Sequence, residues 1–189
     1  TKNSDYVRAL TEVYKKYEDY TAEVAFFIEQ VTGHIIPDFR PVLEFGLDAI
    51  IEQLEQKIAV ETGAVKKANF EAMKLTLVST IELGMRYADI AKEQKKTATP
   101  DRAAQLELME KTLCKVPRQG CDTLYEAIQS YILLWQVMCL EQAPNPFAFS
   151  VGNADRIFEP YRAKEDLSRE DAAELLEHLL VFYNVGDRS

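Results

Sequence analysis

Residues 116–161 constrain the fold of this chain more than any other stretch. A helix-forming run at 122–141 meets the breaker cluster Ala-Pro-Asn-Pro at 143–146. Proline lacks a backbone N–H and disfavours helical geometry in the residue before it, so the helix must end there. A short apolar run at 147–151 follows, and then Gly152 and Pro160. This order predicts a long helix, a sharp break, and then a short strand with a turn.

The rest of the chain is patterned for helices. Apolar residues recur at spacings of three and four in five further segments, at about 4–31, 39–60, 65–96, 101–114 and 169–183. Capping residues stand at the predicted starts: Ser4, Asp38, Asp122 or Thr123, and Ser168 with Asp171. We therefore predict a predominantly α fold with one or two short strands near 147–158. No residue pattern recurs at a fixed period, which argues against a helical-repeat solenoid.

Composition narrows the classes of function. The 189 residues suit one domain, or one with a short extension. The net charge of −9 argues against partners such as nucleic acid or an anionic membrane, because binding either requires clustered Lys and Arg. No apolar run approaches the roughly 20 residues of a membrane span, and the N-terminus has no signal-peptide pattern. We expect a cytoplasmic protein, and the start at Thr1 suggests a fragment.

The three cysteines predict neither a disulfide framework nor a metal site. Their number is odd, and Cys114 and Cys121 are too far apart for a C-x-x-C motif. The chain has only two histidines, so soft ligands are few. We interpret Cys114, Cys121 and Cys139 as structural or incidental thiols in a reducing compartment.

Four local patterns occur in a recognisable order. They are GHIIPDFRPVLEFGL at 33–47, FEA at 70–72 with YADIA at 87–91, VPRQGCDTLYEAIQS at 116–130, and SVGNADRIFEPY at 150–161. Over about residues 30–185 these patterns resemble glycyl radical enzymes, and in particular their pyruvate formate-lyase-like domain. The resemblance implies that residues 1–189 are a single segment of that domain, truncated at its C-terminal end.

The resemblance also implies a fold and a chemistry. Family members are much longer and form a ten-stranded α/β barrel wrapped in helices. A glycyl radical near the C-terminus generates a thiyl radical on a loop cysteine inside the barrel, and a separate iron–sulfur activase installs the glycyl radical with S-adenosylmethionine. This chain would be the helical part of such a barrel. No residue here matches the radical glycine or the active cysteine, and Cys121 lies outside the active loop, so we expect the segment alone to be inactive.

The expected parent is an enzyme of anaerobic metabolism: a radical lyase, a decarboxylase or a formate acetyltransferase-like enzyme. Its expected partners are the rest of the barrel or an identical subunit, the activating enzyme and a small organic substrate. The alternative is a non-catalytic helical protein-interaction domain. Residues 143–161 favour the enzyme, because a plain helical module does not need a proline-rich break followed by a strand with an unpaired edge.

The resemblance places candidate substrate-binding residues at Phe147, Ala148, Phe149 and His34. Glycerol-type dehydratases of the family carry a polar N-G-H-S-I-S-P-G run, and alignment on Gly152 puts Phe147 at its His and Ala148 at its Ser. A wall without hydrogen-bonding groups does not favour burial of a polyol, so we expect a bulkier or less polar substrate.

Two alternatives stay open for these candidates. Phe147 and Phe149 could be ordinary core residues of a strand, and His34 could be a hydrogen-bonded scaffold residue. Several positions also depart from the usual family pattern and indicate a divergent subgroup: Gln119-Gly120-Cys121, Asn153, Arg156 and Glu159.

Overall fold

The structure is a computed structural model that describes residues 5–16, 35–141 and 149–186. Residues 1–33 and 34–189 form two separate units. The described part of the first unit is helix α1 (Asp5–Lys16), in which Arg8 pairs with Asp5 and Lys15 pairs with Glu12. The helix predicted over 4–31 is confirmed over 5–16, and the rest of that range, with the predicted cap at Ser4, lies outside the described residues.

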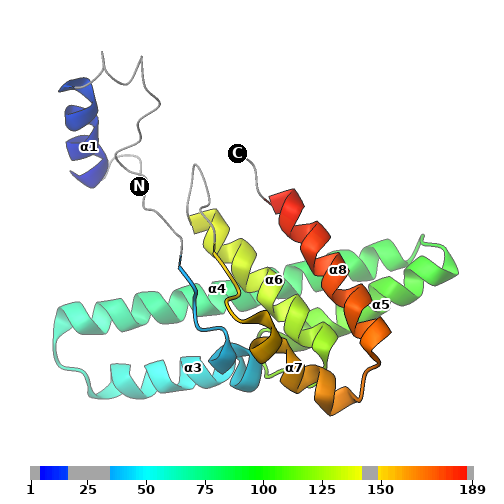
Figure 1. Ribbon diagram of the computed structural model, residues 1–189. Coiled ribbons are helices and arrows are strands. Elements are labelled where there is room, and N and C mark those ends of the chain that lie inside the picture. Colours follow the sequence, from blue (N-terminus) through cyan, green and yellow to red (C-terminus); the bar gives the residue numbers. More distant parts are fainter. Residues whose placement is uncertain (1–4, 17–34, 142–148, 187–189) are drawn as a thin grey trace. The chain divides into compact units, whose positions relative to one another are not determined.

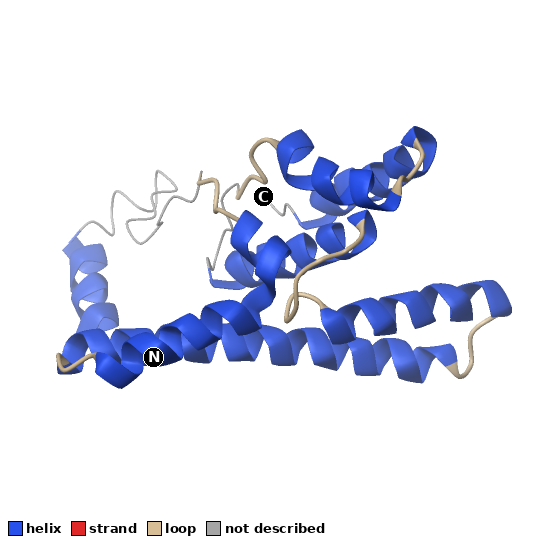
Figure 2. Ribbon diagram, turned by 90° about the horizontal axis from the view of Figure 1, so that it is seen from below, coloured by secondary structure: helices blue, strands red, loops and turns tan. Residues whose placement is uncertain are grey.

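The second unit is built from helices that pack on one long helix and one central helix (Figure 1). The helices are α3 (Arg40–Val60), α4 (Ala64–Lys95), α5 (Pro100–Lys115), α6 (Leu124–Glu141), α7 (Ala154–Glu165) and α8 (Arg169–Gly186). The long helix is α4; α3 packs on its N-terminal half and α5 on its C-terminal half (Figures 1 and 2). The central helix, α6, packs against each of α3, α4, α5, α7 and α8. Within the described ranges, no helix is both long enough and apolar enough to cross a lipid bilayer.

Local signals place most of the helix ends where the sequence predicts them. At the start of α8, the Ser168 hydroxyl accepts a hydrogen bond from the Asp171 N–H at 3.1 Å, as the predicted capping box requires. At α6, the choice between two caps is settled, since Thr123 Oγ1 accepts from the Glu126 N–H at 3.1 Å. Prolines begin α3 and α5, where a missing N–H is harmless.

The predominantly α prediction is confirmed, but the strand prediction is wrong for the residues that the structure describes. Residues 149–153 form no strand, and 154–165 form helix α7, which begins with a hydrogen bond from the Ile157 N–H to the Asn153 carbonyl at 3.1 Å. The Ser150 N–H does reach the Ile35 carbonyl at 3.2 Å. A strand needs a partner ladder, and this one bond does not make one. Residues 147 and 148 lie outside the described residues.

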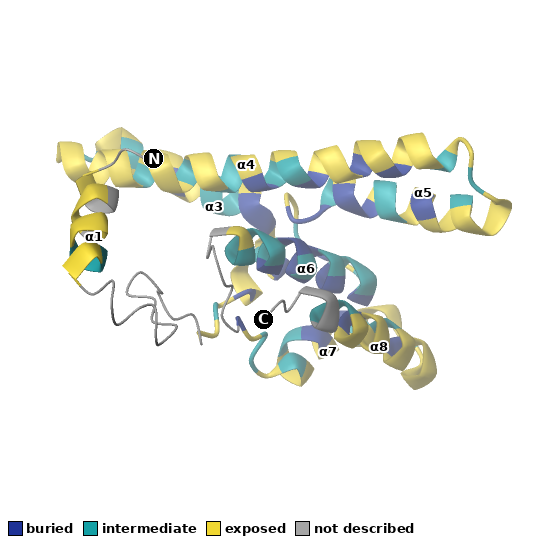
Figure 3. Ribbon diagram, turned by 90° about the horizontal axis from the view of Figure 1, so that it is seen from above, coloured by how far each residue is buried: buried dark blue, intermediate teal, exposed yellow. Residues whose placement is uncertain are grey.

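The core of this unit is a cluster of aromatic rings around Tyr131 of α6. Tyr131 is fully buried, and its ring lies edge-on to Phe39 at 4.7 Å and to Phe158 at 5.9 Å between centroids. Tyr183 of α8 is 6.0 Å from Tyr131 and 4.9 Å from Trp135. Figure 3 shows buried residues gathered on α6 and its neighbours, in contrast to the exposed N-terminal half of α4. Such aromatic pairs add to the stabilisation that burial alone provides.

Candidate functional site

Two of the sequence patterns meet at a kink in α3. Gly46 has φ 80° and ψ 168°, which interrupts the helix and favours glycine over residues with a Cβ. A Cβ at Gly46 would overlap the Arg118 carbonyl oxygen, and a Cβ at Gly120 would overlap the Glu44 carbonyl oxygen. Both glycines are therefore required by the close approach of two backbones.

Hydrogen bonds join this kink to the loop between α5 and α6. Backbone bonds run from the Leu47 N–H to the Pro117 carbonyl at 2.8 Å, from the Asp48 N–H to the Arg118 carbonyl at 3.0 Å, and from the Cys121 N–H to the Leu43 carbonyl at 2.7 Å. Arg118 Nε also donates to Asp48 Oδ2 at 2.8 Å. The kink frees amides from the helical pattern, and the loop satisfies them. We call residues 43–48 and 117–121 together the α3–loop junction.

A charged cluster secures the other side of this loop. Lys115 Nζ donates to Asp122 Oδ2 at 2.7 Å and to Glu126 Oε2 at 2.6 Å. Glu126 Oε2 also accepts from the Asp122 N–H at 2.7 Å, which ties the start of α6 to the loop. Burial opposes the charge on Lys115, but the two carboxylates still raise the pKa of its ammonium group.

Cys121 of the junction, interpreted from the sequence as a structural or incidental thiol, is buried. Burial, and next the nearby Glu126 carboxylate, raise its pKa to about 12. A thiol with so high a pKa is protonated at neutral pH and is a poor nucleophile. Cys114 is exposed and Cys139 is partly buried, and none of the three cysteines is in a disulfide.

The predicted substrate wall is described only at its end. Phe149 is buried in the aromatic core, and its carbonyl accepts a hydrogen bond from Trp135 Nε1 at 3.2 Å. Nearby, Gly152 has φ 76°, and a Cβ there would lie 2.7 Å from Ile36 Cγ2. The structure thus brings together the ends of two sequence patterns, at 35–36 and 149–152. The other three candidates, His34, Phe147 and Ala148, lie outside the described residues.

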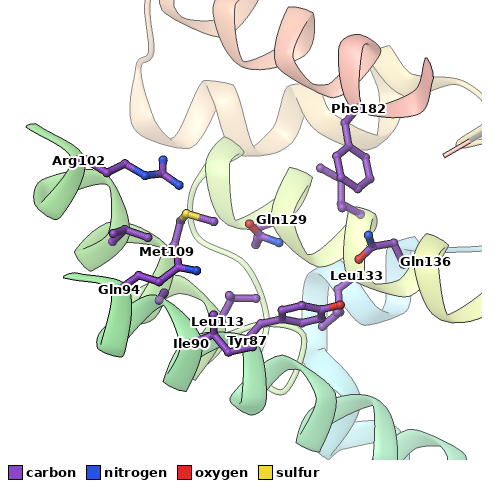
Figure 4. Close-up of a pocket in the computed structure, with 13 residues that line it drawn as sticks. Tyr87, Ile90, Gln94, Arg102, Met109, Leu113, Gln129, Leu133, Gln136 and Phe182 are labelled. Carbon is purple, nitrogen blue, oxygen red and sulfur yellow. The ribbon is translucent and has the colours of Figure 1, made fainter. Parts of the chain in front are cut away.

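A groove opens between four helices on another part of the unit (Figure 4). Its volume is about 330 Å³. Four helices line it: α4 with Tyr87, Ile90, Ala91 and Gln94; α5 with Arg102, Leu106, Met109 and Leu113; α6 with Gln129, Ile132, Leu133 and Gln136; and α8 with Phe182. We call this the four-helix groove. Sequence analysis missed it, because its walls come from segments far apart in the chain. The local signal was weak: Tyr87, Ile90 and Gln94 share one face of α4.

The radical chemistry that the resemblance implies requires a reactive cysteine. No cysteine lines the four-helix groove, and the Cys121 thiol is buried and protonated. Across the described ranges, no group of three or more His, Cys, Asp or Glu side chains is arranged to hold a metal ion. No thiyl or metal step is therefore assigned to these residues.

A family comparison decides the assignment. The family model described as "Pyruvate formate lyase-like" matches residues 1–186, almost the whole chain. The chain belongs to the pyruvate formate lyase-like family of glycyl radical enzymes. The family match spans both patterns that meet at the α3–loop junction, at 33–47 and 116–130.

Individual relatives of this glycyl radical enzyme chain are much longer. It is 28% identical over 157 residues to isethionate sulfite-lyase of Oleidesulfovibrio alaskensis, covering 77% of the chain and 19% of the relative. It is 31% identical over 124 residues to trans-4-hydroxy-L-proline dehydratase of Clostridioides difficile, covering 63% of the chain and 16% of the relative. The chain therefore spans less than a fifth of the length of these curated relatives.

A solved structure supports the same fold. A structure from work on 1,2-propanediol dehydration in Roseburia inulinivorans superposes with a TM-score of 0.73 at 25% identity. The match covers 83% of this chain and 20% of that one. The helices described above are thus the helical part of a glycyl radical enzyme fold.

Proposed function

We propose that this chain is the helical scaffold of a glycyl radical enzyme that acts on a small organic substrate. One observation carries the proposal: two family-like patterns meet at the α3–loop junction, where Arg118 binds Asp48, 70 residues away in sequence. The chemistry of the parent is hydrogen abstraction by a thiyl radical that a glycyl radical generates. The resemblance places no residue of this chain at the active cysteine or the radical glycine, so both come from the rest of the fold.

The contribution of this chain is to hold the end of the substrate wall. The Phe149 ring packs in the core and its carbonyl is bound by Trp135. This anchor fixes one end of the segment that contains Phe147 and Ala148. We assign Phe147, Ala148 and His34 to the substrate side of the scaffold. We assign Phe149 to the end of the substrate wall that is anchored in the core.

The substrate class follows from the missing polar groups. Phe147 and Ala148 offer no side-chain donor or acceptor to a hydroxyl, and a polyol would leave buried hydroxyls unpaired. An aromatic wall favours a larger apolar surface. The proposed reaction is therefore a lyase or decarboxylase reaction on a molecule bulkier than glycerol or a simple diol. Formate acetyltransferase chemistry is a less favoured alternative, because a small polar substrate gains little from contact with an aromatic wall.

The substrate assignment is tested in the full-length enzyme with Phe147→His. A polar group in the wall should shift the ratio of kcat/KM between polyol and bulkier substrates by about tenfold or more, the range that one pocket contact provides. Phe45→His is the matched control, because Phe45 is an exposed phenylalanine of α3. If Phe147→His and Phe45→His leave substrate range equally unchanged, Phe147 is not a pocket residue.

The enzyme assignment is tested first by the gene sequence. The reading frame that contains this chain, or an adjacent frame, should encode a G-C-x-E-like cysteine loop and a C-terminal R-V-x-G-Y-like glycine loop. An activating enzyme with an iron–sulfur cluster and S-adenosylmethionine is the expected partner, in the reducing cytoplasm that unpaired cysteines favour. If neither loop is encoded, the chain is the alternative, a non-catalytic helical protein-interaction domain.

A further inference from the structure

The four-helix groove has an apolar floor and an apolar rim. Ile90 on its α4 side is 50% exposed, and Tyr87 on the same side is also exposed. Met109 and Phe182 face the same space from α5 and α8 (Figure 4). A contiguous apolar groove of this kind is typical of a surface that another protein element covers.

The polar groups of the groove suit a protein segment better than a charged metabolite. Three of them are neutral amides spread along α4 and α6, Gln94, Gln129 and Gln136. The others are the Tyr87 hydroxyl and Arg102, whose Nη1 already donates to Gln105 Oε1 at 2.8 Å. The lining therefore holds no converging pair of charges that would orient an anionic ligand. Long apolar walls with amides at intervals are what an amphipathic helix meets when it lies in a groove.

The neighbouring helix α8 points to the identity of the occupant. Beside its core residues Leu179 and Phe182, α8 carries exposed Leu176 and Leu180, the latter 68% exposed. Its face opposite the core carries Glu170, Glu174 and Glu177. An apolar face wider than the part that the core covers is typical of a helix that contacts a further protein element. A second copy is a poor candidate, because each chain carries a net charge of −9. The solved relative holds four-fifths of its length outside the matched part.

We propose that the four-helix groove is the docking surface for an apolar helix from the rest of the glycyl radical enzyme fold. This inference rests on the proposed function. It adds where on the scaffold the remaining four-fifths of the fold attaches, and it assigns Ile90 and Tyr87 of α4 to that contact.

Cysteine labelling of two matched positions on α4 tests the docking. Ile90→Cys lies on the groove, whereas Leu75→Cys lies at a 67% exposed position outside it. Both are made in a Cys114→Ser background, which removes the exposed native thiol. Each variant is prepared as the isolated chain and as the parent protein expressed from its native gene. Maleimide modification rates are then followed by peptide mass mapping.

In the isolated chain, we expect the two introduced cysteines to react at similar rates. In the parent, the cysteine of Ile90→Cys should react at least tenfold more slowly than in the isolated chain, whereas the rate for Leu75→Cys should be unchanged. Equal rates for Ile90→Cys in both preparations would overturn the proposal. Protection that appears in the isolated chain and rises with its concentration would assign the groove to a second copy, and would also overturn it. The glycyl radical of the same parent preparation, measured by electron paramagnetic resonance, reports the proposed function separately.

Discussion

The distal part of the α3–α4 hairpin and the block around α6 are both helical, but different interactions hold them. Over residues 48–79 of the hairpin, Leu54 is the single buried residue. Its helices are linked by a Lys74–Glu55 ion pair and by Lys57 lying over the Phe70 ring at 5.9 Å from the centroid. Such exposed contacts contribute about 1 kcal/mol or less each.

The block around α6 is held by burial and by backbone contacts between distant segments. Tyr131 is surrounded by aromatic rings, and the α3–loop junction closes one side of the block with hydrogen bonds between residues far apart in sequence. Both regions have a helical sequence pattern, but only the block around α6 is also stabilised by extensive tertiary contacts. The block is therefore the stable scaffold, and the distal hairpin depends on what packs against it.

The largest expected loss of stability comes from a substitution that disrupts the α3–loop junction. Gly46→Ala places a Cβ on the Arg118 carbonyl at a positive φ, so it should lower the free energy of unfolding by about 3 kcal/mol or more. Gly63→Ala is the control in the hairpin, because Gly63 has φ −78° and its added Cβ would meet only the flexible Glu61 carboxylate. Its effect should stay within about 1 kcal/mol. Urea unfolding compares the two, and equal effects would show that the junction is not needed.

A pair of leucine truncations measures the same contrast in side-chain packing. Leu43→Ala removes a side chain that is 1% exposed, and should cost about 2–5 kcal/mol. Leu75→Ala, on the exposed hairpin, should change the free energy of unfolding by about 0.5 kcal/mol or less. A large loss for Leu75→Ala in the isolated chain would mean that the hairpin is packed more tightly than its exposure indicates.

Alkaline pH should weaken the block more than the hairpin. Burial raises the pKa of Tyr183, and burial followed by the charges of Cys121 and Glu44 raises that of Tyr161, each to about 12. The pKa of Cys121 is also about 12. Above the ordinary values the unfolded chain loses these protons while the folded chain keeps them, so the free energy of unfolding falls as pH rises.

The window for this loss runs from about pH 9 to about pH 12. Urea unfolding at about pH 8 and about pH 11 measures it, and the Tyr183→Phe variant should show a shallower decline. A free energy of unfolding that stays constant over this window would mean that these groups ionise in the folded state.

The smallest expected effect concerns one atom of the core. In the described structure the Tyr131 hydroxyl is buried and has no hydrogen-bond partner. Tyr131→Phe removes that unpaired group, so it should leave the free energy of unfolding unchanged or raise it by up to about 1 kcal/mol. Thermal unfolding of the two proteins measures this. A loss of more than about 1 kcal/mol would reveal a partner for the hydroxyl, such as a buried water.

Features set by neighbouring residues were predictable from the sequence. The Ser168–Asp171 cap and the prolines that begin α3 and α5 act within one helical turn, so the pattern is sufficient to place them. The strand prediction near 147–158 failed over the described residues, because an apolar run becomes a strand only beside a partner. Its described part instead forms irregular backbone and helix α7.

The candidate site likewise has features that the sequence could predict and features that depend on tertiary packing. The sequence patterns around Gly46 and Gly120 could be recognised singly, but their contact depends on the packing of α3 against the loop before α6. The four-helix groove has no linear pattern, since its lining is drawn from four helices. The role of Phe147, Ala148 and His34 remains a prediction from the sequence, and Phe149 is placed only as an anchor.

The central claim, that this chain serves a glycyl radical enzyme, is tested most directly by electron paramagnetic resonance of the parent protein. The protein is incubated anaerobically with its activating enzyme, S-adenosylmethionine and a reductant. The account predicts an organic radical whose hyperfine splitting disappears when the protein is made with Cα-deuterated glycine. A fully folded parent protein that forms no radical with an active activating enzyme would contradict it.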